Sequence, residues 1–156
     1  MTVEEIAERL VAREQRVSVA EADTCGFVGY LLSTVPGSSK FFPGGVIAYT
    51  GGLKQSVLNV PDDVYREKGS VSPEVAIAMA KGVRDLTGTD YGISVTGVAG
   101  PTGGRSGLPI GTFYLGLAGP GELEVAERIQ TDAGDRDGNK RQAAQAVLDL
   151  LGRHVG

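Results

Sequence analysis

A short loop between an expected strand and an expected helix holds the first residues suited to chemistry. Residues 22–26 read Ala-Asp-Thr-Cys-Gly. Free backbone N–H groups at such a junction point into the loop, where they favour an anion such as a phosphate or a developing oxyanion. The loop does not match the Walker phosphate loop, because it lacks that motif's lysine. The pattern therefore indicates part of a small-molecule site without identifying the ligand.

Lys54 is a second candidate for chemistry. It follows a pair of glycines at the expected start of a short helix. Two interpretations are open. The side chain is a solvated surface cation, or it is buried beside the 22–26 loop, where a lowered pKa would let its amine serve as a base.

Arg136 and Arg141 lie near the start of the last expected helix. Two guanidinium groups on one helix could clamp a phosphate, because each offers several donors in a fixed fork. The alternative is a surface ion pair with Asp135 or Asp137. His154 is near the end of the chain and is assigned no role.

Glycine accounts for 24 of the 156 residues, about twice its usual share. The glycines cluster beside expected strands and helices, where they permit sharp turns and close approach to a ligand. The largest cluster lies in the loop at 97–109. It does not match the dinucleotide-binding fingerprint, because no helix opens after it.

Apolar periodicity and capping residues predict the elements that must position these groups. We expect helices at residues 2–14, 27–34, 53–58, 61–68, 72–87 and 135–151, and strands at residues 16–21, 45–49, 91–96, 110–118 and 122–130. The strand at 45–49 is expected to be buried. The helix at 72–87 is expected to begin with Ser72 as N-cap and to turn Val75, Met79, Val83 and Leu86 inward.

Alternating strands and helices predict a single α/β domain over residues 1–156, a three-layer α/β/α sandwich. The terminal hairpin makes the sheet mixed, although mainly parallel. Ligands of such sheets bind beyond the carboxyl ends of the strands. The loops at 22–26, 50–52 and 97–109 are expected to meet there and form the site.

Composition excludes several classes of function. Fifteen Lys and Arg against nineteen Asp and Glu give a net charge of −4, which does not favour a nucleic-acid backbone. No apolar run approaches the length of a membrane span, and the acidic N-terminus is unlike a secretory signal. One Cys and one His do not favour a metal site. We expect a cytoplasmic protein without a metal or cofactor, and no nucleic acid or membrane as partner.

Seven segments carry a family resemblance, and they follow one another in order along nearly the whole chain. They lie at residues 18–26, 35–39, 42–54, 69–76, 95–101, 109–112 and 134–137. Residues 20–26 correspond to an Ala-Glu-Ser-Cys-Thr-Gly-Gly motif, and residues 96–101 read Thr-Gly-Val-Ala-Gly-Pro. In these segments the chain resembles the CinA C-terminal domain family.

The resemblance implies both a fold and an activity. Members of the family resemble nicotinamide-nucleotide amidohydrolases, which convert nicotinamide mononucleotide to nicotinate mononucleotide and ammonia. It implies a Ser–Lys mechanism with Lys54 as the base. It also implies a homo-oligomer and a pyridine mononucleotide as ligand. The expected substrate-binding residues are Gly26, Tyr49, Thr96, Gly97, Gly100, Arg136 and Arg141.

The nucleophile of this mechanism is missing. Ala22 occupies the serine position, Asp23 replaces the usual cysteine, and Cys25 replaces the first glycine. Alanine has no atom that can attack a carbonyl, so we expect deamidase activity to be impaired or absent.

Three interpretations of this loop are open. The chain is a non-catalytic nucleotide-binding or regulatory module, or the nucleophile has moved to Thr24 or Cys25, or Asp23 activates water. The plainer roles are a small buried residue for Cys25 and a helix N-cap for Asp23.

Overall fold

A five-stranded sheet forms the centre of the computed structural model, which describes residues 1–156. The strands are β1 (Val17–Glu21), β2 (Gly45–Ile47), β3 (Tyr91–Gly97), β4 (Thr112–Ala118) and β5 (Glu124–Gln130), in the order β2-β1-β3-β4-β5. The β2–β1 and β1–β3 pairings are parallel, and the β3–β4 and β4–β5 pairings are antiparallel. The expected mixed sheet is confirmed, with only β4 running against the other strands.

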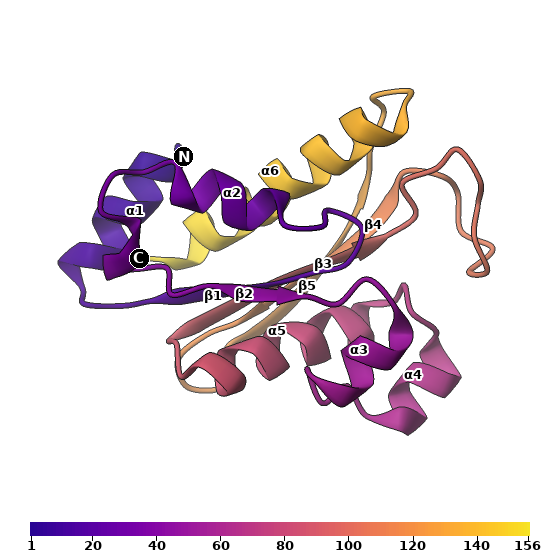
Figure 1. Cartoon of the computed structure of the whole chain (residues 1–156), viewed down its shortest axis with the longest axis horizontal. Helices are drawn as coiled ribbons and strands as arrows, with labels where there is room; N and C mark the ends of the chain where they lie inside the picture. The colour runs from indigo at the N-terminus through magenta and orange to yellow at the C-terminus, as the bar shows by residue number, and fades with distance from the viewer.

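Helices cover both faces of this sheet (Figure 1). One layer contains α1 (Val3–Ala12), α2 (Phe27–Ser33) and the long α6 (Arg136–His154). The other contains α3 (Gly51–Ser56), α4 (Asp62–Lys68) and α5 (Pro73–Thr87). A short 3-10 helix, η1 (Ser38–Lys40), lies between α2 and β2 in the chain. This arrangement confirms the three-layer α/β/α sandwich. None of the helices combines the length and apolar character that crossing a bilayer requires.

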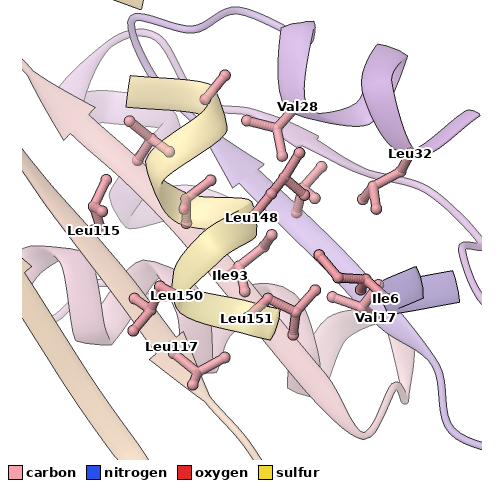
Figure 2. Close-up of a cluster of buried hydrophobic side chains, with 14 of the residues drawn as sticks. Ile6, Val17, Val28, Leu32, Ile93, Leu115, Leu117, Leu148, Leu150 and Leu151 are labelled. Atoms are coloured by element: carbon pink, nitrogen blue, oxygen red, sulfur yellow. The ribbon is translucent and has the colours of Figure 1, made fainter. Parts of the chain in front are cut away.

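Two apolar clusters hold the layers together. The larger has 22 buried residues and fills the space between the sheet and the layer of α1, α2 and α6, where Ile6, Ile93 and Leu148 meet (Figure 2). The smaller has eight buried residues, including Val75 and Met79, and lies under α5. Burial of this apolar surface supplies most of the driving force for folding.

The helix α5 lies unusually close to the sheet. A Cβ built on Gly92 of β3 or Gly116 of β4 would overlap the backbone carbonyls of Ala80 and Ala76 in α5. Ser94 also donates its hydroxyl to the Ala76 carbonyl at 2.6 Å. Glycines on the sheet therefore set the depth of α5, and with it the position of the loop that leads into the helix.

Side-chain caps begin α1 and α5, and the predicted N-cap at Ser72 is confirmed. Thr2 and Glu5 form a capping box at the start of α1. The Ser72 hydroxyl accepts a hydrogen bond from the Val75 N–H at 3.2 Å and caps α5. Such caps satisfy N–H groups that have no partner inside the helix.

Two burial predictions are wrong. The strand at 45–49 ends at Ile47 and is not buried, because β2 pairs only with β1 and forms an edge of the sheet. Leu86 is 57% exposed. The buried stripe of α5 runs through Val75, Met79 and Val83, so its next position four residues on is Thr87 rather than Leu86.

Candidate functional site

Lys54 is buried, although it carries a charged group on a short helix. Only 2% of its surface is exposed. Its Nζ donates to the Ser70 Oγ at 2.6 Å and to the Thr96 Oγ1 at 3.4 Å. The interpretation of Lys54 as a solvated surface cation is therefore wrong. The alternative, a buried lysine side chain, is confirmed.

Burial changes the proton affinity of Lys54 and of a nearby carboxyl group. Desolvation lowers the pKa of Lys54 from its ordinary value, and the charge of Asp23 partly opposes that shift. Desolvation raises the pKa of Asp23, against the opposing influence of Lys54 and of the Ala99 N–H. Both groups are thus shifted toward their neutral forms. A neutral amine can accept a proton, which is the property a general base requires.

Ser70 is the polar partner of Lys54 that the sequence did not single out. It lies in the loop between α4 and α5, and the Thr96 hydroxyl donates to its backbone carbonyl at 2.8 Å. Thr96 therefore contacts both Ser70 and Lys54 from the end of β3. The only sequence signal for Ser70 is its place in the segment at 69–76, just before the N-cap of α5.

A pocket of about 910 Å³ opens beside this cluster. Ser70 lines it, whereas Lys54 does not. The walls come mainly from the end of α4 with the loop that follows it, and from the loop after β3. The charged lining residues are Arg66, Lys68, Arg105 and Arg136, against Asp23 and Glu67. The excess of cations suits an anionic ligand.

Arg136 connects several of the residues expected to bind substrate. Its Nη1 donates to the Gly100 carbonyl and its Nη2 to the Tyr49 hydroxyl, each at 2.6 Å. Gly97 and Gly100 also line the pocket. Asn139, which the sequence did not indicate, donates to the Ala99 carbonyl at 3.1 Å and holds the same loop. One end of α6 is thereby fastened to the loop after β3.

Arg141 is not brought to the pocket. Its Nε donates to the Asp137 carboxylate at 2.8 Å one turn earlier in α6. Its guanidinium also lies 4.8 Å from the centre of the Phe27 ring. The geometry matches the surface ion pair rather than a second phosphate ligand.

The 22–26 loop divides between core, pocket and surface. Ala22 is fully buried, Thr24 is 3% exposed and its hydroxyl has no hydrogen-bond partner, and Asp23 lines the pocket. Cys25 is exposed, so the interpretation as a small buried residue is wrong. Cys25 and Gly26 have φ values of 50° and 96°, and these two left-handed residues turn the chain at the surface before α2.

Asp23 is not the N-cap of α2, since that position belongs to Gly26. The carboxylate of Glu21 replaces a conventional cap. It accepts hydrogen bonds from the N–H groups of Val28 at 2.9 Å and Gly29 at 3.0 Å. The start of α2 is therefore anchored to the end of β1. Two of its free N–H groups already donate to the Glu21 carboxylate.

Fold and site together define an α/β domain with a cation-rich pocket at the carboxyl ends of its parallel strands, next to a buried lysine and two hydroxyl groups. The chain belongs to the CinA C-terminal domain family, whose model matches residues 1–155.

Curated relatives support this assignment. A CinA-like protein from Synechococcus is 46% identical over 144 residues, which cover 92% of this chain and 34% of the relative. A CinA-like protein from Anaeromyxobacter is 43% identical over 146 residues, which cover 94% of this chain and 35% of the relative. The chain thus spans about a third of the length of these relatives.

Solved structures share the fold over nearly the whole chain. A CinA superfamily protein from Klebsiella pneumoniae has a TM-score of 0.93 and 28% identity, with 98% of this chain and 94% of that chain covered. A CinA superfamily protein from Escherichia coli has a TM-score of 0.91 and 28% identity, with 97% and 90% covered.

Proposed function

We propose that this domain binds a pyridine mononucleotide of the nicotinamide mononucleotide type, and that it does not deamidate this ligand through position 22. The observation that carries the proposal is the cation-rich pocket. Its wall contains Arg136 and the segment 97–100, which belong to two of the segments in which the chain resembles the family. Membership of the CinA C-terminal domain family supports the class of ligand.

The phosphate of such a ligand would find its counter-charge in the arginines of the pocket. Arg136 already donates to two oxygen acceptors, and its guanidinium is held in place by the Gly100 carbonyl and the Tyr49 hydroxyl. Arg66 and Arg105 line the same space. Hydrogen bonds between guanidinium and phosphate are charge-assisted, so they are stronger than neutral ones.

The loss of the family's reaction follows from the 22–26 loop. Ala22 carries no nucleophilic atom. A substitute within the loop is poorly supported, because the Thr24 hydroxyl is enclosed and Cys25 does not line the pocket. Neither side chain makes a hydrogen bond to Lys54, whose partners are Ser70 and Thr96. These contacts favour the interpretation of the domain as a nucleotide-binding or regulatory module. They do not favour a deamidase whose nucleophile lies in this loop.

Calorimetry and an ammonia assay test the proposal together. The wild-type protein is expected to bind nicotinamide mononucleotide or nicotinate mononucleotide, and to release no ammonia from the former above background. Ala22→Ser restores a hydroxyl at the family position and is expected to raise ammonia release. Absence of binding to both nucleotides would refute the ligand class. Family-like turnover by wild type that persists in Thr24→Val and Cys25→Ala would refute the loss of activity.

A further inference from the structure

Ser70 joins the buried lysine to the pocket. Its Oγ lies 2.6 Å from the Lys54 Nζ, the shorter of that amine's two hydrogen bonds. Ser70 lines the pocket, whereas Lys54, at 2% exposure, does not. A ligand in the pocket would therefore contact Ser70, which is hydrogen-bonded to the buried amine.

The geometry of this pair is held by a third group. Thr96 donates to the Ser70 carbonyl at 2.8 Å and accepts from the Lys54 Nζ at 3.4 Å. The end of β3, which is distant from both in the chain, thus fixes α3 and the loop before α5 relative to one another. A nucleophile next to a base that is itself oriented by a further residue is the pattern of activated serines.

The surroundings of Lys54 favour the neutral amine that such a base needs. Burial lowers the pKa of Lys54, and Asp23 is the charged group that counters this shift. The hydrogen-bond partners of the Lys54 amine are the hydroxyls of Ser70 and Thr96, which carry no charge. A neutral amine can accept the proton of a hydroxyl hydrogen-bonded to it.

Two backbone N–H groups without a partner lie in the same segment. The backbone N–H groups of Ser70 and Val71 make no hydrogen bond within the protein, and both residues line the pocket. The neighbouring Ser72 is not an equivalent nucleophile, because its hydroxyl accepts from the Val75 N–H as the cap of α5. Preorganised N–H groups stabilise the negative charge that forms when a carbonyl is attacked.

We propose that Ser70 is the nucleophile of a Ser70–Lys54 pair that hydrolyses an ester or amide bound in this pocket. The Ser70 Oγ forms a bond to the carbonyl carbon while the neutral Lys54 amine accepts the hydroxyl proton. The ammonium returns that proton to the departing alcohol or amine as its bond to carbon breaks. Water then attacks the acyl group by the same proton path, releases the acid and restores Ser70.

This inference goes beyond the proposed function, because it assigns chemistry to a residue outside position 22 and takes as substrate an ester or amide other than nicotinamide mononucleotide. The test therefore uses a reagent that reports on the nucleophile alone. A fluorophosphonate transfers its phosphonyl group to an activated serine: an Oγ–phosphorus bond forms, fluoride leaves, and Lys54 takes the hydroxyl proton.

Wild-type protein is expected to gain one phosphonyl group, which peptide mapping by mass spectrometry places on Ser70. Ser70→Ala is expected to abolish the adduct, and Lys54→Met to slow its formation roughly a hundredfold, the usual range for loss of a general base. Ser33→Ala alters an exposed serine at the end of α2, remote from the pair in the chain, and is expected to react like wild type.

The pH dependence distinguishes a base from a merely structural lysine. The rate in wild type is expected to rise with pH as Lys54 loses its proton, at a lower pH than an ordinary lysine titrates, and Lys54→Met is expected to lack this rise. Mapping on the wild-type protein needs no folded variant. No adduct in wild type, or an adduct on another residue, would overturn the proposal, whether or not the protein binds pyridine nucleotides. Nucleotide binding without labelling would overturn it and leave the proposed function intact.

Discussion

The hydroxyl of Thr96 donates to the backbone carbonyl of Ser70 at 2.8 Å, and this contact joins the end of β3 to the loop before α5. The two residues are 26 positions apart in the chain. Since Lys54 also donates to Thr96, one threonine organises the polar side of the pocket from within the core.

Thr96→Val is expected to lower the free energy of unfolding by about 1–3 kcal/mol, because it leaves the Ser70 carbonyl without its donor while keeping the side-chain shape. Urea unfolding followed by circular dichroism measures the change. Thr34→Val is the matched control: Thr34 is exposed, its hydroxyl donates to the Leu31 carbonyl, and little change is expected. Equal effects of the two substitutions would argue against a special role for the contact.

Glu21→Gln is expected to destabilise the fold by about 1–3 kcal/mol, because a buried amide supplies only one acceptor oxygen to the two N–H groups that the carboxylate now serves. Those groups belong to Val28 and Gly29 at the start of α2. Thermal unfolding of the variant measures the loss. Glu8→Gln, at an exposed position of α1, serves as control and is expected to behave like wild type. A stable Glu21→Gln protein would mean that water or another group caps α2.

The Lys54 amine is expected to titrate below the ordinary lysine value of 10.5, because desolvation lowers its pKa. Nuclear magnetic resonance of the lysine side chains measures the midpoint directly. Asp23→Asn is expected to lower that midpoint further, since the carboxylate charge opposes the effect of burial. A midpoint shared with the exposed lysines, or a rise in Asp23→Asn, would contradict the described environment.

Stability is expected to increase with pH between the lowered pKa of folded Lys54 and the ordinary value near 10.5. In that interval the unfolded chain binds more protons at this lysine than the folded chain does, so the free energy of unfolding has a positive slope. Urea unfolding at several pH values, compared between wild type and Lys54→Met, isolates this contribution. The same slope in both proteins would assign it to other groups.

Arg136→Gln is expected to weaken binding of nicotinate mononucleotide by about tenfold or more, since a charged hydrogen bond contributes about 1.5–3 kcal/mol. Arg141→Gln provides a matched control on the same helix, because Arg141 is paired with Asp137 outside the pocket. Calorimetry at moderate salt compares the two. A larger loss in Arg141→Gln would place the phosphate at the other face of α6.

Local patterns were sufficient for most of the elements. The Ser72 N-cap of α5 and the apolar periodicity of the segments 2–14 and 135–151 are signals within a few residues, and each helix formed close to where its signal predicted. The seven matching segments also predicted the family, and the family model bears this out. Local patterns did not predict the burial of the strand at 45–49 or of Leu86 correctly. Whether a strand lies at the edge of the sheet, as β2 does, depends on pairings that no local pattern contains.

The sequence by itself determined the three-layer fold, the absence of a serine at position 22 and the positions of the glycine-rich loops along the chain, because turn chemistry and apolar periodicity act over short distances. Only the tertiary structure decided that Lys54 is buried, that Ser70 is its partner and that Arg141 faces away from the pocket. The environment of Lys54 depends on side chains that packing brings together across 16 or more positions, and on the desolvation that packing alone imposes.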